Sequence, residues 1–449
     1  MKQHRPSSGF SEAQGRRTAE PPDTGGGRAA RALLAAVLLA GCAPAFAPPP
    51  PPAPEEIPAL EAAVRQNPMD VTVLVSLGAA YRAAGRAEDA RGTLERALEL
   101  RPDDPGAVFY LGLAYEDQQA YDQALAHYGR YIQTSRSAEL RDALRRRIPV
   151  LEREQLRLAV RQALSQESEL AQTRPQPRTV AVFPFVYAGA SPDLRPLGRA
   201  LAEFLVTDLS ATDRLTVLER VRVQYLLDEM RLAESGYVDR TTAARSGRLL
   251  GAGRVVQGRI VGDDRQVEVS AAVVGVGGDW DGRIAPVTEQ DALPQFFDLE
   301  KRLVLALFRS LEIELTPAER ERINRRPTEN LQALLEFGLG LEAHDRGNFL
   351  QATEHFERAV ALDPGFELAR ERAGQARELA TGTQLNTDRL AVLGTAELEG
   401  RAVPPEPPGL DALQGLIPSM GGRNAASEVL GREGVGTRRP AIEILIRRP

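Results

Sequence analysis

Two consecutive segments of the chain repeat each other with a period of 34 residues. A period of this length predicts stacked pairs of antiparallel helices, because one pair cannot bury its apolar face alone. Small residues such as Gly78 and Ala90 indicate where the two helices of a pair cross closely. The matching positions are Leu74, Leu77, Gly78, Tyr81, Gly85, Ala90, Leu94, Ala97 and Pro102, and then Val108, Leu111, Gly112, Tyr115, Gln119, Ala124, Tyr128, Tyr131 and Arg136.

This pattern resembles the tetratricopeptide (TPR) repeat, which we assign to residues 59–136. A C-terminal unit is predicted at 316–380, where Thr316 is the expected N-cap of the first helix. Glu336 replaces a usual apolar residue there, so we expect that face to be exposed. The C-terminal unit repeats the pattern at Leu339, Gly340, Ala343, Gly347, Phe349, Ala352, Phe356, Ala359 and Pro364.

The inner helix positions of the first repeats are the candidate partner-binding residues. We expect Val75, Arg82, Phe109, Leu113 and Glu116 to be exposed on this face. TPR surfaces imply envelope proteins or peptides as partners, although the face lacks the Lys and Asn residues that would grip a peptide carboxylate. The alternative is that these helices only cap the neighbouring domain and pack on it.

Residues 137–177 read as a capping helix and a linker. The segment 137–172 is rich in alternating charge and carries a stripe of apolar residues from Leu140 to Leu164. Pro149 is predicted to break or kink this helix. A coiled coil is the alternative interpretation.

Residues 178–315 predict an α/β (α+β) layer sandwich in the centre of the chain. Near-continuous or alternating apolar runs predict its strands. Gly262, Asp263 and Asp264 predict a tight hairpin turn, and 275–282 is expected to be a loop. The predicted strands are 179–186, 215–220, 254–261 and 266–274, and the predicted helices are 197–209, 223–232, 241–250 and 296–311.

Four segments in this order carry a second resemblance. They read VAVFPF from Val180, LVTDL from Leu205, LTVLERVRVQYLLDEM from Leu215 and AARSGRLLGAGRVVQGRIVG from Ala243. Together they resemble the periplasmic domain of the CsgG-like family, which includes the curli secretion channel subunit and the FlgO- and LpoB-type lipoproteins. The resemblance implies a periplasmic, lipid-anchored envelope factor without catalytic residues.

The chain departs from the channel member of that family. The channel carries long amphipathic hairpins that insert into the membrane, whereas the links at 186–197 and 275–282 are short here. A subunit of an oligomeric CsgG-type outer-membrane secretion channel is therefore the alternative function.

The segment that ends at Cys42 predicts export and lipidation. Arg28 and Arg31 precede a run of apolar residues at 32–40, which is typical of a secretory signal and too short for a membrane-spanning helix. Leu39-Ala40-Gly41-Cys42 resembles the lipobox of bacterial lipoproteins, which implies cleavage before Cys42 and its acylation. The alternatives are a plain signal peptide with a chance cysteine, or a buried apolar helix.

These features predict a signal peptide at 1–41 with a long polar n-region, and a start codon further along the sequence is the alternative. Residues 42–58 then form a lipidated, Pro-rich tether. Ala43 favours the outer membrane under the sorting rule of enteric bacteria. Low aromatic content and many Gly and Pro residues predict a mostly disordered tail at 381–449, except for a strand-like end at 441–447.

Composition argues against several classes of function. Beyond residue 41 the chain holds 50 Lys and Arg against 59 Asp and Glu, which does not suit a nucleic-acid binder. Cys42 is the single cysteine, so no disulfide is expected. The four histidines form no metal-binding spacing, and His344 and His355 are expected to be solvated. We therefore expect no metal and no cofactor.

Possible catalytic groups have simpler interpretations. The Gly251-Ala252-Gly253 segment follows a helix and precedes a strand, which is the reverse of a phosphate loop, and predicts a helix C-cap. The pairs Asp263 with Asp264 and Asp279 with Asp281 are typical of turns. The sequence thus predicts a non-enzymatic, lipid-anchored periplasmic adaptor for envelope assembly, secretion or surface-structure biogenesis such as curli assembly, with homo-oligomerisation left open.

Overall fold

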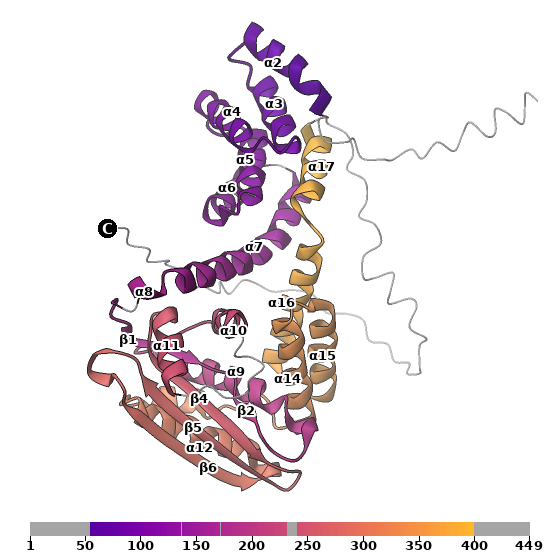
Figure 1. Ribbon diagram of the computed structural model, residues 1–449. Coiled ribbons are helices and arrows are strands. Elements are labelled where there is room, and N and C mark those ends of the chain that lie inside the picture. The colour runs from indigo at the N-terminus through magenta and orange to yellow at the C-terminus, as the bar shows by residue number, and fades with distance from the viewer. Residues whose placement is uncertain (1–53, 136, 171, 231–239, 399–449) are drawn as a thin grey trace, which may run out of the picture. The chain divides into compact units, whose positions relative to one another are not determined.

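The computed structural model describes residues 54–398 except 136, 171 and 231–239 (Figure 1). The predicted signal peptide, Cys42, most of the Pro-rich tether and the strand-like end at 441–447 lie outside the described residues. The protein has several domains, in which helical repeats are followed by a mixed sheet and then by further helices.

The N-terminal repeats form antiparallel helix pairs. Gly78 and Gly112 let the helices of each pair approach closely, because a β-carbon at Gly78 would lie 2.5 Å from Leu94 and one at Gly112 would lie 2.7 Å from Tyr128. Asp70 caps the second helix by accepting hydrogen bonds from the backbone N–H groups of Thr72 and Val73. The helices are α2 (Ile57–Gln66), α3 (Val71–Ala83), α4 (Ala87–Leu100), α5 (Pro105–Asp117) and α6 (Tyr121–Thr134).

Helix α7 (Ala138–Ser165) runs without interruption from the repeats to the sheet domain, and the short helix α8 (Glu167–Leu170) follows it. The structure therefore excludes a break at Pro149, and a kink there stays a prediction. A proline inside a helix loses one backbone hydrogen bond. Packing on both sides of Pro149 offsets this loss, because Leu144 and Leu151 are fully buried.

The sheet has the strand order β3-β1-β4-β5-β6, with β2 paired to β4. Strands β1, β3 and β4 are parallel, whereas β4, β5 and β6 are antiparallel neighbours. The strands are β1 (Gln176–Val182), β2 (Val186–Tyr187), β3 (Thr216–Val217), β4 (Ala252–Gly262), β5 (Gln266–Gly275) and β6 (Ile284–Ala292). Strand β6 is missing from the sequence prediction, which also made β3 too long.

Helices cover both faces of the sheet, as the predicted layer sandwich requires. Alternating strand residues such as Val182 and Val256 face α9 (Leu197–Leu209) and α12 (Phe296–Ser310). The next residues along the strands face α10 (Arg220–Glu229), α11 (Arg240–Leu250) and the last turns of α7.

The C-terminal helices share the first of these two cores. Phe337 and Phe366 pack on Phe204 of α9 with ring centroids 6.2 and 6.1 Å away. One hydrophobic core therefore extends across the predicted domain boundary between residues 315 and 316. The C-terminal helices are α13 (Pro317–Ile323), α14 (Leu331–Asp345), α15 (Phe349–Leu362), α16 (Glu367–Thr383) and α17 (Thr387–Leu398).

The prediction of disorder from residue 381 onward is wrong for residues 381–398, which contain the end of α16 and the whole of α17. Helix α16 continues to Thr383, and α17 begins at Thr387. Asn386 caps α17, because its Oδ1 atom accepts a hydrogen bond from the backbone N–H of Arg389. The remainder of the predicted tail, 399–449, lies outside the described residues. None of the helices in the described part of the chain is both long and apolar enough to span a membrane.

Candidate protein-binding site

The candidate site is the inner face of the N-terminal repeats, formed by α3, α5 and the first turns of α7. We call this surface the repeat groove. The side chains of Val75, Phe109 and Leu113 line it, and they belong to one buried cluster with Leu385 and Leu390 from the C-terminal part of the chain. The repeat groove is therefore occupied by the chain itself, through α17 and the residues just before it (Figure 1).

Helix α17 makes specific contacts in the groove. The hydroxyl group of Tyr110 lies 2.8 Å from that of Thr395 and also donates to the backbone carbonyl of Ala391 at 3.4 Å. Gly394 lies directly against Phe109, since a β-carbon at that position would overlap the aromatic ring. A small residue is thus required on α17 where it crosses α5.

Charged residues complete the walls of the repeat groove. Arg82 pairs with Asp117 at 2.7 Å and reaches Asp388 of α17 at 3.6 Å. Glu116 accepts a hydrogen bond of 2.6 Å from the hydroxyl of Tyr128 and pairs with Arg147 of α7 at 2.6 Å. Each of these charges therefore has a partner inside the groove, and Arg82 is the one that touches α17.

The predicted exposure of the candidate partner-binding residues is wrong. Val75, Arg82, Phe109, Leu113 and Glu116 are all buried, with at most 9% of their surface exposed. The positions face the groove as the repeat pattern predicts, but α17 and α7 cover them. The prediction missed this cover because α17 lies more than 250 residues further along the chain than the repeats.

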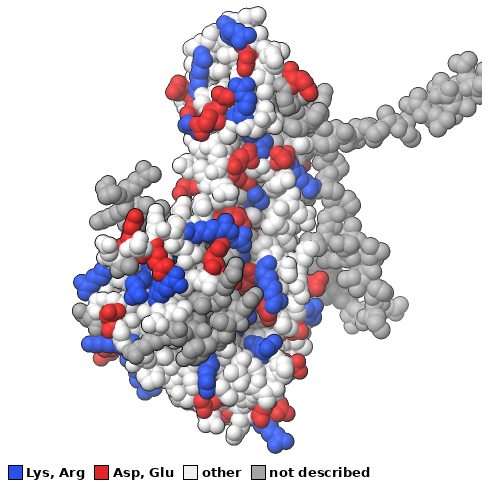
Figure 2. Space-filling model, viewed as in Figure 1, with Lys and Arg blue, Asp and Glu red and all other residues white. Residues whose placement is uncertain are grey.

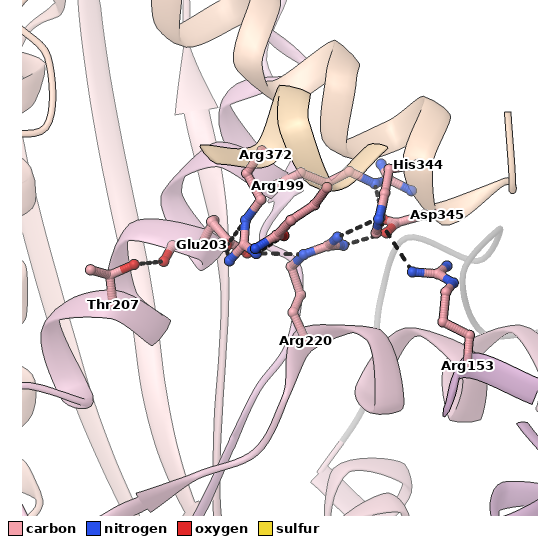
Figure 3. A network of polar contacts seen from close by, with 9 residues as sticks. Arg153, Arg199, Glu203, Thr207, Arg220, His344, Asp345 and Arg372 are labelled. Atoms are coloured by element: carbon pink, nitrogen blue, oxygen red, sulfur yellow. Dashed lines mark hydrogen bonds and ion pairs between the residues drawn. The ribbon is translucent and has the colours of Figure 1, made fainter. Parts of the chain in front are cut away.

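A second site, made of charged side chains, lies between the sheet domain and the C-terminal helices (Figure 3). Glu203 of α9 is almost fully buried and pairs with Arg220 at 3.0 Å and with Arg372 of α16. Arg220 and Arg199 both pair with Asp345 at the end of α14, the second at 3.1 Å. We call these five residues, together with His344 and Arg153, the buried charge cluster.

Burial and the neighbouring arginines set the pKa values in this cluster. Burial alone would raise the pKa of Glu203, but Arg372 and Arg220 hold it below its ordinary value. Burial, followed by the charges of Arg153 and Arg220, lowers the pKa of His344 well below its ordinary value. His344 is therefore neutral near neutral pH.

The two C-terminal histidines are not solvated as predicted. The Nε2 atom of His344 lies 3.2 Å from Arg153, and its Nδ1 atom lies 3.4 Å from Arg220. His355 is half-buried and contacts Glu336 at 2.8 Å. Glu336 also pairs with Arg358, so the charged position that replaces the usual apolar residue faces α15. No pattern in the sequence shows that α14 ends against two arginines from other domains.

Asp263 at the β4–β5 turn has a structural role. The Oδ1 atom of Asp263 accepts hydrogen bonds from the backbone N–H groups of Arg265 and Gln266 at 2.9 and 3.0 Å, and these bonds lower the pKa of Asp263. Gly251 has a positive φ of 70°, as a helix C-cap requires. Within the described ranges, no group of three or more His, Cys, Asp or Glu side chains could hold a metal ion.

Comparisons with known proteins match two regions of the chain. Residues 57–105 and 76–139 match the family described as Tetratricopeptide repeat. Residues 153–288 match the family described as Curli production assembly/transport component CsgG, a region that begins within α7 and ends within β6. A search of curated proteins finds no match.

Two of the solved structures that match this chain are described as tetratricopeptide repeat proteins. One is a tetratricopeptide repeat protein from Parabacteroides merdae, with 14% identity over 72% of this chain and 91% of that one, and a TM-score of 0.20. Another is the P58(IPK) TPR domain, with 12% identity over 82% of this chain and 87% of that one, and a TM-score of 0.23. The matches to the two family models show that the chain combines tetratricopeptide repeats at 57–139 with a CsgG-family region at 153–288.

Proposed function

We propose that this protein is a lipid-anchored adaptor of the cell envelope that docks protein partners and catalyses no reaction. The observation that carries the proposal is the repeat groove, which accepts a helix through apolar contacts, a hydroxyl pair and one ion pair. A groove of this kind recognises a helical segment rather than a small molecule. The match to the CsgG family supports a place in the cell envelope.

In this proposal the regions of the chain have distinct tasks. Residues 1–41 direct export and are removed, and Cys42 is acylated. The structure has residues 54–58 in helices, so the Pro-rich tether is shortened to 43–53, and as polyproline II it would span about 34 Å at about 3.1 Å per residue between the membrane and the folded domains. The repeats at 59–136 dock a partner, and the regions 178–315 and 316–380 form the body that holds them through α7.

The surface charge agrees with a protein partner better than with nucleic acid. Figure 2 shows acidic and basic side chains interspersed on the face in view. A nucleic-acid binder would instead gather Lys and Arg along one stripe. The formal net charge of −6 also disfavours association with a phosphate backbone.

The alternative is a subunit of a CsgG-type secretion channel, and the match at 153–288 to an assembly/transport component favours it. The two functions differ in what holds the protein in the membrane. An adaptor is held by its lipid alone, whereas a channel subunit is also held by inserted protein.

The test is fractionation of a bacterium with two membranes that expresses the full-length chain. We expect the wild type to stay in the outer membrane after a carbonate wash and Cys42→Ala to run free in the periplasm. Ala43→Asp is the matched control, since it keeps the acylated cysteine and is expected to move the protein to the inner membrane. Carbonate-resistant association of Cys42→Ala would contradict the adaptor and favour the channel.

A further inference from the structure

We propose that α17 is an internal ligand that closes the repeat groove, and that a partner helix binds by displacing it. This inference rests on the proposed function, because it concerns how the same groove is regulated. It also defines the partner: a helix that presents the same side chains as α17.

Helix α17 behaves as a ligand and not as part of the repeat array. The repeats end with α6 at Thr134, and the described chain crosses the whole sheet domain before α17 begins at Thr387. Within the repeats, Leu94 and Tyr128 already fill the space between paired helices, next to Gly78 and Gly112. The helix pairs thus have their own core, and α17 adds to the surface that remains.

Helix α17 presents a specific pattern of side chains to the repeat groove. Leu390, Ala391, Gly394 and Thr395 lie on one side of the helix, because residues four apart share a face. All four are buried, and Asp388 precedes them by less than one turn. A helix that replaced α17 would therefore read Asp-x-Leu-Ala-x-x-Gly-Thr, with an acidic residue for Arg82, a small residue against Phe109 and a hydroxyl group for Tyr110.

Helix α17 is held weakly enough to be displaced. A helix of 12 residues is marginally stable on its own, so its order depends on the groove. The ion pair between Asp388 and Arg82 contributes little, since 88% of the Asp388 side chain is exposed. Only residues 384–386 join α17 to α16, which keeps the released helix close to the groove.

The short connection between α16 and α17 sets how strongly α17 competes with a free helix for the repeat groove. A short linker gives an effective concentration of about 1 mM. A free helix with an intrinsic dissociation constant of about 10 µM would then bind the closed groove about 100-fold more weakly than the open one. A matching partner helix must therefore overcome this loss of affinity before it can occupy the repeat groove.

The experiment measures binding of a labelled peptide of residues 385–398 to the mature soluble chain, which begins after Cys42. The open form is the double variant Leu390→Asp with Gly394→Ala, because a charge and an overlapping methyl group expel α17 from the groove. The matched control is Gly374→Ala on α16, where an added β-carbon meets no atom within 4 Å. A second peptide that carries Gly394→Ala tests the contact with Phe109.

We expect the peptide to bind the double variant at least about tenfold more tightly than the wild type or Gly374→Ala. The peptide with Gly394→Ala should lose this binding. Equal binding to wild type and double variant would overturn the proposal, and so would no binding to a folded double variant. Circular dichroism and hydrogen exchange in α4 and α6 report folding. Loss of the repeats in the double variant would also overturn the proposal, since α17 would then be part of the fold.

The result is independent of the lipid anchor because the measured chain lacks Cys42. Failure of the fractionation test would remove the envelope adaptor and leave the peptide result standing. Failure of the peptide test would remove closure by α17 and leave the adaptor standing.

Discussion

His344 makes the stability of the C-terminal half of the protein depend on pH. Burial and the charges of Arg153 and Arg220 lower its pKa well below the ordinary value, so the folded protein keeps the ring neutral. The unfolded chain protonates this ring near pH 6.5. Between that pH and the lower pKa of the folded state, the unfolded chain binds more protons, so the contribution of His344 to stability falls as the pH falls.

The magnitude follows from this difference in bound protons. The slope approaches 1.36 kcal/mol per pH unit for one group. Between about pH 7 and about pH 5.5, His344 should therefore cost the folded state about 1.2 kcal/mol. These pH values lie above the pH range in which Glu203 stops stabilising the folded state, because the pKa of that carboxyl group lies below its ordinary value in the folded protein.

Glu300 acts in the opposite direction within the same window. Burial, followed by the charge of Asp208, raises the pKa of Glu300 to about 8. The folded state then holds a proton that the unfolded chain has lost, so this group adds stability as the pH falls from about 8 toward its unfolded value. The pH dependence of the wild type alone would hide the effect of His344, and the comparison must use a variant.

The assay is urea unfolding of wild type and His344→Gln at about pH 7 and about pH 5.5. The amide of the glutamine can accept hydrogen bonds from Arg153 or Arg220 and takes up no proton. We expect the stability of the variant relative to wild type to rise by about 1.2 kcal/mol at the lower pH. Leu350→Ala, at an exposed position on the neighbouring helix α15, is the control and should keep the pH dependence of the wild type. Parallel pH dependence in wild type and His344→Gln would refute the reasoning.

Two further substitutions test the cores. Glu300→Gln should stabilise the protein at about pH 8.5 by at least about 1 kcal/mol, since it removes a carboxyl group that burial disfavours when ionised; a destabilised variant in urea at that pH would contradict this. Phe337→Ala should destabilise the sheet domain and the C-terminal helices together by about 3–5 kcal/mol, because its fully buried ring contacts Phe204 and Phe366. Leu350→Ala, at an exposed position, should change stability by less than about 0.5 kcal/mol, and separate unfolding of the two regions in Phe337→Ala would count against a shared core.

The repeat architecture could be predicted from the sequence because its signal is local and periodic. Gly78 and Gly112 recur at the helix crossings, and the structure places Leu94 and Tyr128 against them. The central sandwich could be predicted equally well, since most of its strands are apolar runs bounded by turn residues. Strand β6 lacks such an uninterrupted run, because Pro286 lies within it. An edge strand tolerates a proline, and β6 lies at the edge of the sheet.

The candidate site could be predicted only in part. The repeat pattern identifies the groove-facing positions, such as Phe109 and Leu113, but burial depends on which distant segment packs there. Helix α17 carries a recognisable start signal in Asn386, followed by Leu390 and Ala391 at helical spacing. The composition of the whole stretch 381–449 masked this signal. The buried charge cluster has no local signal, because Glu203, Arg220 and Asp345 come from three separate helices.

Hydrogen exchange in the full mature chain tests most directly whether α17 closes the repeat groove. The backbone amides of residues 390–398 should exchange far more slowly than those of the free peptide 385–398, because a docked helix protects them. In Gly394→Ala, both these amides and those of α5 near Phe109 should exchange faster, whereas Gly374→Ala should leave them unchanged. Exchange of α17 in the wild type at the rate of the free peptide would contradict the account.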